Sequence, residues 1–411
     1  MTSTQPRDAA IEQAVAAPPE DLHHPPPLDQ PRIAALDGIR GFAILLIIFF
    51  HYYDIDGVFV RGTIPAYILS LTRLTWTGID FFFVLSGFLI GGILLEARAS
   101  PTYYRTFYIR RAYRILPLYG VVIVLYWLTA PIFPSTGTPV PSYIYLTLTQ
   151  NIWVALGGKL DVSVWLLVTW TIATEEQFYL VAPAMIRKIS PARLPLLVAA
   201  AVVFALILRI ALFETSQFDP RATLVLMPAR ADAFMLGIGS AWLVRDPRGA
   251  RWLVERRGWL YLLTFALGIV LLVFTKKGWT LDTFAMSTFG FTVTSFFYVA
   301  LVVLAVSHPE GPVGRFFSLR PLIAMGAIAY GLYLFHSPVK ELLHLVFNGH
   351  RPRLASWRDV GVDLLAFGIT LLLARLSWVH FERPLVRRGH RYSYWPSPVA
   401  RTRVRREVRG A

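Results

Sequence analysis

Long apolar stretches dominate this chain and restrict its fold more than any other feature. Ten of them are about 17 to 26 residues long, which is the length that an α-helix needs to cross the hydrocarbon core of a bilayer. They cover residues 33–53, 78–96, 115–133, 164–186, 194–213, 228–244, 258–275, 283–306, 321–346 and 360–381. The stretches are continuous rather than alternating, which excludes a membrane β-barrel. The sequence therefore predicts an all-α integral membrane protein with about ten transmembrane helices.

Composition argues against the soluble alternative, in which the same stretches would be buried core helices. Hydrophobic residues make up 55% of the chain and charged residues 16%, whereas a soluble domain is typically about 25% charged. The chain has no cysteine, which excludes a disulfide scaffold and a thiolate nucleophile. The HExxH, GxSxG and GxxxxGK[ST] patterns are absent as well, so neither a metal nor a permanently bound cofactor is predicted.

The positive charge is unevenly distributed along the chain, whose formal net charge is +15. With the N-terminus in the cytoplasm, the cytoplasmic segments hold 26 Lys and Arg residues and the external segments hold 9. This bias predicts that both termini are cytoplasmic, so the charge sets topology and does not indicate nucleic-acid binding. We expect a disordered, proline-rich tail over 1–32, a membrane domain over 33–384 and an arginine-rich tail over 385–411.

The first apolar stretch carries three side chains that are unusual inside a membrane. A charge at the bilayer centre costs about 2.5–3.5 kcal/mol, so such residues are functional candidates by default. Asp37 lies three residues before Arg40, a spacing that brings the two side chains together on a helix. Arg40 and His51 are eleven positions apart, which places them on one helix face about 16 Å apart along the axis. A buried structural role is the alternative for His51.

A cationic patch is predicted at the cytoplasmic end of the third stretch, from Arg110, Arg111 and Arg114. These residues are three or four positions apart on a helix. Arginine suits bidentate binding of phosphate. The alternative is a positive anchor for anionic lipid headgroups.

Carboxylates and further ionisable residues lie within the later stretches. Glu175 and Glu176 are adjacent, so their side chains point about 100° apart on a helix. Such a carboxylate can orient an imidazole, or it can bond to a neighbour such as Arg209. Four supporting candidates, for which packing or structural ion pairing is the alternative, are Asp80, Arg230, Asp232 and His336.

Six phrases of the sequence resemble, in order, the membrane acyltransferase-3 family of bacterial transmembrane O-acyltransferases. They are LDGIRGFAIL…H (36–51), GIDFFFVLSGFLI (78–90), FYIRRAYRILPLY (107–119), TIATEEQFYL (171–180), AIAYGLYLFHSP (327–338) and FERP (381–384). The resemblance implies ten core spans, an acyl-CoA donor (acetyl-CoA above all) reached from the cytoplasm, and an acceptor hydroxyl that is often external. Longer members add a periplasmic esterase-like domain, and we expect the core form without it here.

The resemblance also implies roles for the candidate residues. The arginine–histidine motif of the family falls on Arg40 and His51, its RRxxR motif falls on the arginine patch, and its acidic motif falls on the glutamate pair. His51 is then expected to act as a general base on the acceptor hydroxyl, or as an acyl-His relay across the membrane. Donor binding is expected from Arg40, Arg110, Arg111 and Arg114, and orientation of the histidine from Glu175 or Glu176.

The sequence leaves the acceptor open within this enzyme class. A cell-envelope polysaccharide or a lipid-linked sugar is the favoured glycan acceptor, and a small natural product such as a macrolide sugar is the alternative. A proton-coupled transporter is the rival class, because intramembrane His and Glu residues can relay protons; the lack of an internal repeat counts against it. We expect a multi-pass protein of the bacterial cytoplasmic membrane, while the oligomeric state stays open.

Overall fold

The computed structural model describes residues 33–53, 74–129, 140–157, 164–215, 217–279, 281, 283–354 and 356–395. Within these ranges the chain is helical and contains no strand, and Ala34–Tyr394 belong to one compact unit. The predicted N-terminal tail, 1–32, and residues 396–411 of the predicted C-terminal tail lie outside the described residues. The first part of that C-terminal tail, 385–395, is described.

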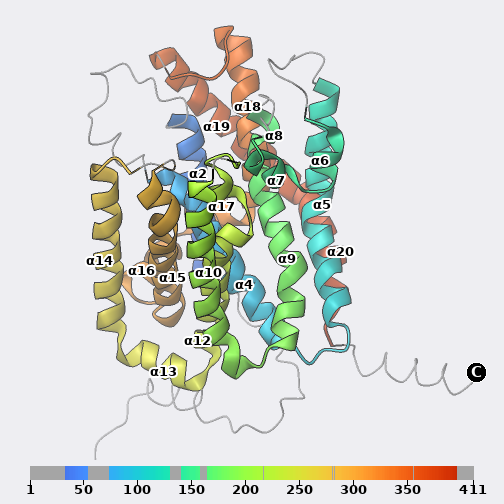
Figure 1. The fold of residues 1–411 in the computed structure, drawn as a ribbon. Helices are drawn as coiled ribbons and strands as arrows, with labels where there is room; N and C mark the ends of the chain where they lie inside the picture. The colour runs from blue at the N-terminus through green and yellow to red at the C-terminus, as the bar shows by residue number, and fades with distance from the viewer. Residues whose placement is uncertain are drawn as a thin grey trace, which may run out of the picture. The chain divides into compact units, whose positions relative to one another are not determined.

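A helix occupies each of the ten predicted stretches (Figure 1). The long helices are α2 (Ala34–Tyr53), α4 (Gly78–Glu96), α5 (Tyr103–Thr129), α9 (Trp170–Lys188), α10 (Leu194–Glu214), α12 (Ala231–Arg245), α14 (Arg257–Lys276), α15 (Phe291–Ser307), α18 (Ala329–Asn348) and α19 (Trp357–Ser377). The shorter elements are η1 (Thr75–Thr77), α6 (Ser142–Leu146), α7 (Gln150–Ala155), α8 (Val164–Leu167), η2 (Pro191–Arg193), α11 (Ala222–Val225), η3 (Pro228–Arg230), α13 (Pro247–Glu255), η4 (Met286–Gly290), α16 (Pro312–Phe317), α17 (Arg320–Ala327), η5 (Trp378–Glu382) and α20 (Arg383–His390).

These helices confirm an all-α membrane protein. Among the described residues, seven are long and apolar enough to cross a membrane, and the bent pair of α17 and α18 would be an eighth. The helix α12 has only 15 residues, and α9 carries Glu175, Glu176, Arg187 and Lys188. The prediction of about ten spans is therefore matched in position by ten helices, of which seven or eight qualify by length and apolarity alone.

Two of the predicted spans differ in their local structure. The third was expected to begin at residue 115, but α5 already begins at Tyr103, because arginines can continue a helix while their long stems direct the charge to a polar environment. The arginine patch therefore lies on α5 itself, seven to eleven residues after its start. The ninth span is divided near Ile328, where α17 and α18 meet with a bend of 76°. As a result, α17 packs against α2, whereas α18 packs mainly against α19.

The helices α4 and α12 cross so closely that two glycines touch the backbone of the opposite helix. A Cβ atom on Gly87 would lie 2.1 Å from the carbonyl oxygen of Phe234. A Cβ atom on Gly237 would lie 2.3 Å from the carbonyl oxygen of Val84. Small residues allow such approach in membranes, where packing replaces the hydrophobic effect as the driving force.

We expect Gly87→Ala to destabilise the protein by about 1–3 kcal/mol, the usual cost of overpacking. The matched control is Gly368→Ala, since Gly368 lies in α19 with no heavy atom within 4 Å of the added Cβ. Alanine there should be neutral or stabilising because it is the better helix former. Thermal unfolding of the two purified variants in detergent tests this, and equal melting temperatures would contradict the close crossing.

Candidate functional site

The first helix carries both ends of the candidate site. The helix α2 runs without interruption from Ala34 to Tyr53, so the separation of about 16 Å between Arg40 and His51 along its axis holds. The predicted ion pair is confirmed, because Nη1 of Arg40 lies 2.6 Å from Oδ1 of Asp37. One end of the site is therefore marked by Arg40 and the other by His51.

At the His51 end, two histidines from different helices lie side by side. The ring centroids of His51 and His336, which belongs to α18, are 5.0 Å apart. The Nδ1 atom of His51 lies 2.8 Å from the carbonyl oxygen of Ile47, and that of His336 lies 2.7 Å from the carbonyl oxygen of Tyr333. Because a carbonyl only accepts, each Nδ1 carries the proton, and each neutral ring keeps its lone pair on Nε2. Both imidazoles are therefore in the tautomer of a base.

The backbone around this histidine pair is held by two polar side chains that the sequence interpretation overlooked. Nζ of Lys340 donates to the carbonyl oxygens of His51, at 2.9 Å, and Tyr52, at 3.3 Å. A positive charge at the C-terminal end of a helix is favourable, so Lys340 stabilises the end of α2. The Tyr52 hydroxyl donates to the carbonyl oxygen of His336 at 3.2 Å. The signal in the sequence is a lysine inside an apolar stretch, one turn after His336.

At the Arg40 end, the predicted arginines and glutamates come together. Arg40, Arg111 and Arg114 all lie within electrostatic range of Glu175 on α9. Glu176 lies in the same cluster, within range of Arg111, and its buried Oε1 has no hydrogen-bond partner among the residues that the structure describes. Three helices, α2, α5 and α9, thus contribute to one charged cluster inside the bundle.

Ser86 and Glu382 also belong to this charged cluster, although neither was a candidate. The Ser86 hydroxyl, from α4, lies near the Glu175 carboxylate and 2.5 Å from the hydroxyl of Tyr179. The Glu382 carboxylate lies within electrostatic range of Arg114. Gly331 leaves the room that Glu382 needs, since a Cβ atom there would lie 3.1 Å from the Glu382 Oε1 atom.

Arg110 makes different contacts from the other two arginines of the patch. Its Nε donates to the carbonyl oxygen of Tyr392 at 2.9 Å, and its guanidinium lies 5.0 Å from the ring centroid of Tyr394. Burial raises the pKa of the Tyr394 phenol, which therefore remains protonated at neutral pH. The Thr106 hydroxyl donates to the carbonyl oxygen of Ser393 at 3.1 Å. Arg110 thus holds the segment that follows α20 against α5.

One face of α18 connects the charged cluster with the histidine pair. Tyr333 lies within electrostatic range of Glu175, and its ring centroid is 5.8 Å from that of His336. One turn earlier, Tyr330 lies within range of Glu176. Residues three apart share a helix face, so the two tyrosines and His336 form a polar line through the apolar bundle. This pattern is visible in the phrase AYGLYLFH once the helix is known.

The glutamates and His51 have different neighbours in the structure. The contacts of Glu175 run to Ser86 and the arginines, whereas Nδ1 of His51 is bound by the Ile47 carbonyl oxygen. A backbone carbonyl therefore orients the His51 ring. Direct orientation of His51 by Glu175 or Glu176 stays a prediction.

Buried ion pairs hold three of the supporting candidates, Asp80, Arg230 and Asp232. Arg230 pairs with Asp80, not with Asp232. Asp232 instead accepts from Nη1 of Arg209, at 2.9 Å, and both side chains are fully buried. The physical reason is that residues two apart on a helix do not face each other. Because the Arg209 guanidinium is paired with Asp232 of α12, Arg209 is not the partner of Glu175 or Glu176.

The sequence matches the acyltransferase-domain family over residues 33–379. It is 27% identical to YrhL of Bacillus subtilis, over 87% of this chain and 56% of the relative. It is 25% identical to the peptidoglycan O-acetyltransferase OatA of Listeria monocytogenes over the same shares, and 24% identical to the O-acetyltransferase OatA of Staphylococcus aureus strain MRSA252, over 90% and 60%. The chain thus spans less than two thirds of the length of these relatives. No solved structure matches it.

The family match extends from the start of α2 to the π-helical turn η5. It therefore contains the histidine pair and every member of the charged cluster except Glu382. A multi-pass helical bundle, a polar line through its interior and a match over most of the sequence lead to the same conclusion: the chain belongs to the acyltransferase-3 family.

Proposed function

We propose that this protein is a membrane O-acyltransferase that moves an acetyl group from cytoplasmic acetyl-CoA to a hydroxyl of a cell-envelope polysaccharide, with peptidoglycan as the first acceptor to test. The observation that carries the proposal is the polar line from the arginine–glutamate cluster to the paired imidazoles. The names of both OatA relatives support the acetyl group, and the name of the Listeria relative, a peptidoglycan O-acetyltransferase, supports the glycan acceptor. A bacterial cytoplasmic membrane is the proposed location, because the donor is a cytoplasmic metabolite.

The charged cluster is the proposed donor end. Acyl-CoA carries phosphates, and arginine guanidinium groups bind phosphate through parallel hydrogen bonds. The positive-inside bias of the sequence places Arg40, Arg111 and Arg114 on the cytoplasmic half of the bundle. The glutamates beside them balance charge and fix the guanidinium orientation, which prepares the remaining N–H groups for the donor.

The histidine pair is the proposed reaction centre, which the thioester arm of the donor would reach along α2. In direct transfer, the acceptor oxygen attacks the thioester carbonyl carbon while Nε2 of His51 removes the hydroxyl proton. The carbon–sulfur bond breaks, the imidazolium returns its proton to the thiolate, and CoA leaves as the thiol. In the relay variant, Nε2 attacks the thioester carbonyl carbon, and the carbon–sulfur bond breaks to release the CoA thiolate, which takes a proton from water. The acceptor hydroxyl then attacks the acetyl-imidazolium, loses its proton to water and restores the neutral imidazole. Both routes need the lone pair that the Ile47 contact leaves on Nε2.

Label transfer tests the proposal and separates it from the transporter alternative. Purified protein in liposomes is supplied with acetyl-labelled CoA and a panel of peptidoglycan fragments, a lipid-linked sugar and a glycosylated macrolide. We expect the labelled acetyl group to form an ester on a glycan acceptor, from which mild base releases it. The CoA moiety should not be incorporated into the acceptor. Proton-coupled movement of intact substrate across the membrane, with no ester formed from any acceptor of the panel, would overturn the proposal.

A further inference from the structure

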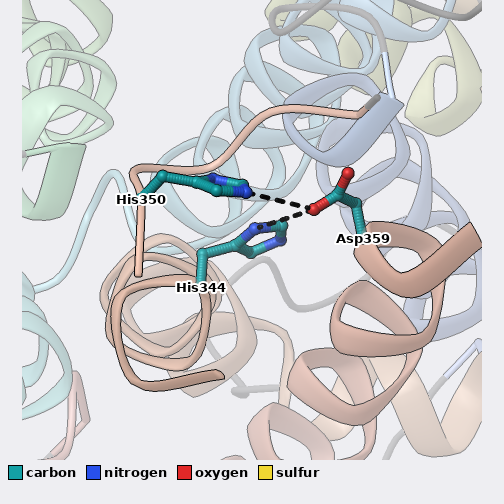
Figure 2. Close-up of side chains that lie close together, drawn as sticks. All are labelled: His344, His350 and Asp359. Carbon is teal, nitrogen blue, oxygen red and sulfur yellow. Dashed lines mark ion pairs between the residues drawn. The ribbon is translucent and has the colours of Figure 1, made fainter. Parts of the chain in front are cut away.

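A second polar cluster lies at the far end of α18, away from the arginine–glutamate cluster, and it joins α18 to α19. His344 belongs to the last turns of α18, His350 to the turn that follows, and Asp359 to the first turn of α19. Figure 2 shows both imidazole rings directed at the Asp359 carboxylate. One ligand atom from each residue lies within 4.8 Å of the other two. His344 and Asp359 are buried, and the side chain of His350 is 28% exposed.

The hydrogen bonds on the outer side of each imidazole ring determine which ring nitrogen carries the proton and which one directs a lone pair at the carboxylate. Nε2 of His344 lies 3.0 Å from Oδ1 of Asp363, and Nδ1 of His350 lies 2.8 Å from the carbonyl oxygen of Arg351. Both partners are acceptors, so these two nitrogens carry the protons. The lone pairs are then on Nδ1 of His344 and Nε2 of His350, which lie 4.0 and 3.7 Å from Oδ1 of Asp359.

Asp359 is held so that one of its oxygen atoms faces the two lone pairs. Its Oδ2 accepts from the backbone N–H and the hydroxyl of Ser356, each at 2.8 Å, in the capping box of α19. Its Oδ1 accepts from Nδ2 of Asn348 at 2.7 Å. In the neutral tautomers, two nitrogen lone pairs and one carboxylate oxygen therefore converge. The Asn348 amide, whose Nδ2 also lies 3.4 Å from Nδ1 of His344, offsets part of their mutual repulsion, and a cation between them would offset it further.

We propose that His344, His350 and Asp359 bind a divalent transition-metal ion, with Zn²⁺ as the ion that the ligand set favours. Two imidazoles and a carboxylate are a ligand set typical of zinc, and three protein ligands leave a fourth position for water. The hydrogen bond from His344 to Asp363 is the outer contact that zinc-bound histidines characteristically make. Zinc holds such ligands about 2.0–2.2 Å away, so they lie roughly 3.3–3.5 Å apart, and a small inward rotation of the side chains completes the set.

The position of the metal site gives it a mechanical consequence for the histidine pair. His336, Lys340 and His344 follow at intervals of four residues, so they form one stripe on α18, and all three are buried. His336 contacts the His51 ring, and Lys340 binds the end of α2. A metal ion that ties His344 to α19 would fix the position of these three side chains relative to α19. The site itself does not depend on the proposed transfer activity, and it is tested without it.

Zinc content and thermal unfolding test the proposal. The full chain, purified through a tag that lacks histidine, is treated with a chelator, supplied with ZnCl₂ and freed of excess metal. We expect one zinc per wild-type chain by mass spectrometry of the metal, and a higher melting temperature with zinc than with chelator. His350→Ala should lose at least tenfold in zinc affinity and should lose the zinc-dependent rise, because His350 is half-exposed in a turn and can be removed without disturbing the core.

Two further variants keep the test decisive. Asp363→Asn removes only the outer contact of His344 and should weaken zinc binding about 10- to 100-fold. His380→Ala removes an exposed histidine of η5, outside the cluster, and should bind zinc like the wild type. Equal zinc uptake by wild type and His350→Ala, or a melting temperature that does not respond to zinc in the wild type, would overturn the metal site and leave protonated histidines paired with Asp359.

Discussion

Replacing His51 with alanine is expected to lower acetyl transfer from acetyl-CoA at least about 100-fold, because a positioned general base typically contributes 10²–10⁴ to the rate. The loss should appear in kcat rather than in the KM for acetyl-CoA, since the donor phosphates are proposed to bind about 16 Å away, near Arg40. The measurement is the initial rate of ester formation on the glycan acceptor over a range of acetyl-CoA concentrations.

The structure makes this substitution a clean test of chemistry. The contacts of Lys340 go to the backbone carbonyl of His51, and an alanine at position 51 keeps that carbonyl. The imidazole bond to Ile47 is local to one turn of α2, but the ring also lies against His336, so the melting temperature of the variant is measured beside its rate. His380→Ala is the matched control for loss of a histidine. If folded His51→Ala protein turned over normally and His336→Ala lost most of its activity, the general base would be His336 and not His51.

The parts of the fold that depend on local composition could be predicted from the sequence. Apolar stretches marked all ten helices, because a membrane span needs only length and apolarity. Asp37 and Arg40 were paired correctly, because partners three apart on one helix are fixed by helical geometry. The bend between α17 and α18 was missed, since the apolar pattern continues across Ile328 and nothing in composition requires a turn of 76° there.

Contacts between helices were the part that the sequence could not supply. Arg230 and Asp232 are neighbours in sequence, yet each pairs with a residue far along the chain, Asp80 and Arg209. The proposed metal site escaped motif analysis for the same reason, because its residues come from a helix end, a turn and the next helix rather than from a fixed short spacing. Similarly, the role of Tyr333 became visible only from its neighbours in the fold, the Thr171 hydroxyl of α9 and the ring of His336.

Removing Arg111 or Arg114 is expected to raise the KM for acetyl-CoA about 10- to 100-fold, with a smaller change in kcat. A hydrogen bond to a charged group contributes roughly 1.5–3 kcal/mol, and each 1.4 kcal/mol is a factor of ten in affinity. Substitution by glutamine keeps the length and polarity of the side chain while it removes the charge. The measurement is the dependence of the initial rate on acetyl-CoA concentration, with direct binding of unlabelled acetyl-CoA as a second readout.

Comparison among the arginines of α5 tests whether a change in KM arises from binding of the donor phosphates or from contact with lipid headgroups. Arg105 is exposed on the same helix, so Arg105→Gln removes a charge of the same type without touching the cluster and should leave KM unchanged. Arg110→Gln should lower the melting temperature more than it raises KM, because Arg110 holds the backbone at Tyr392. If all four substitutions changed KM equally, the arginines would act only as a diffuse positive surface facing lipid headgroups. A selective effect at Arg111 and Arg114 would assign phosphate binding to the two arginines of α5 that lie near Glu175.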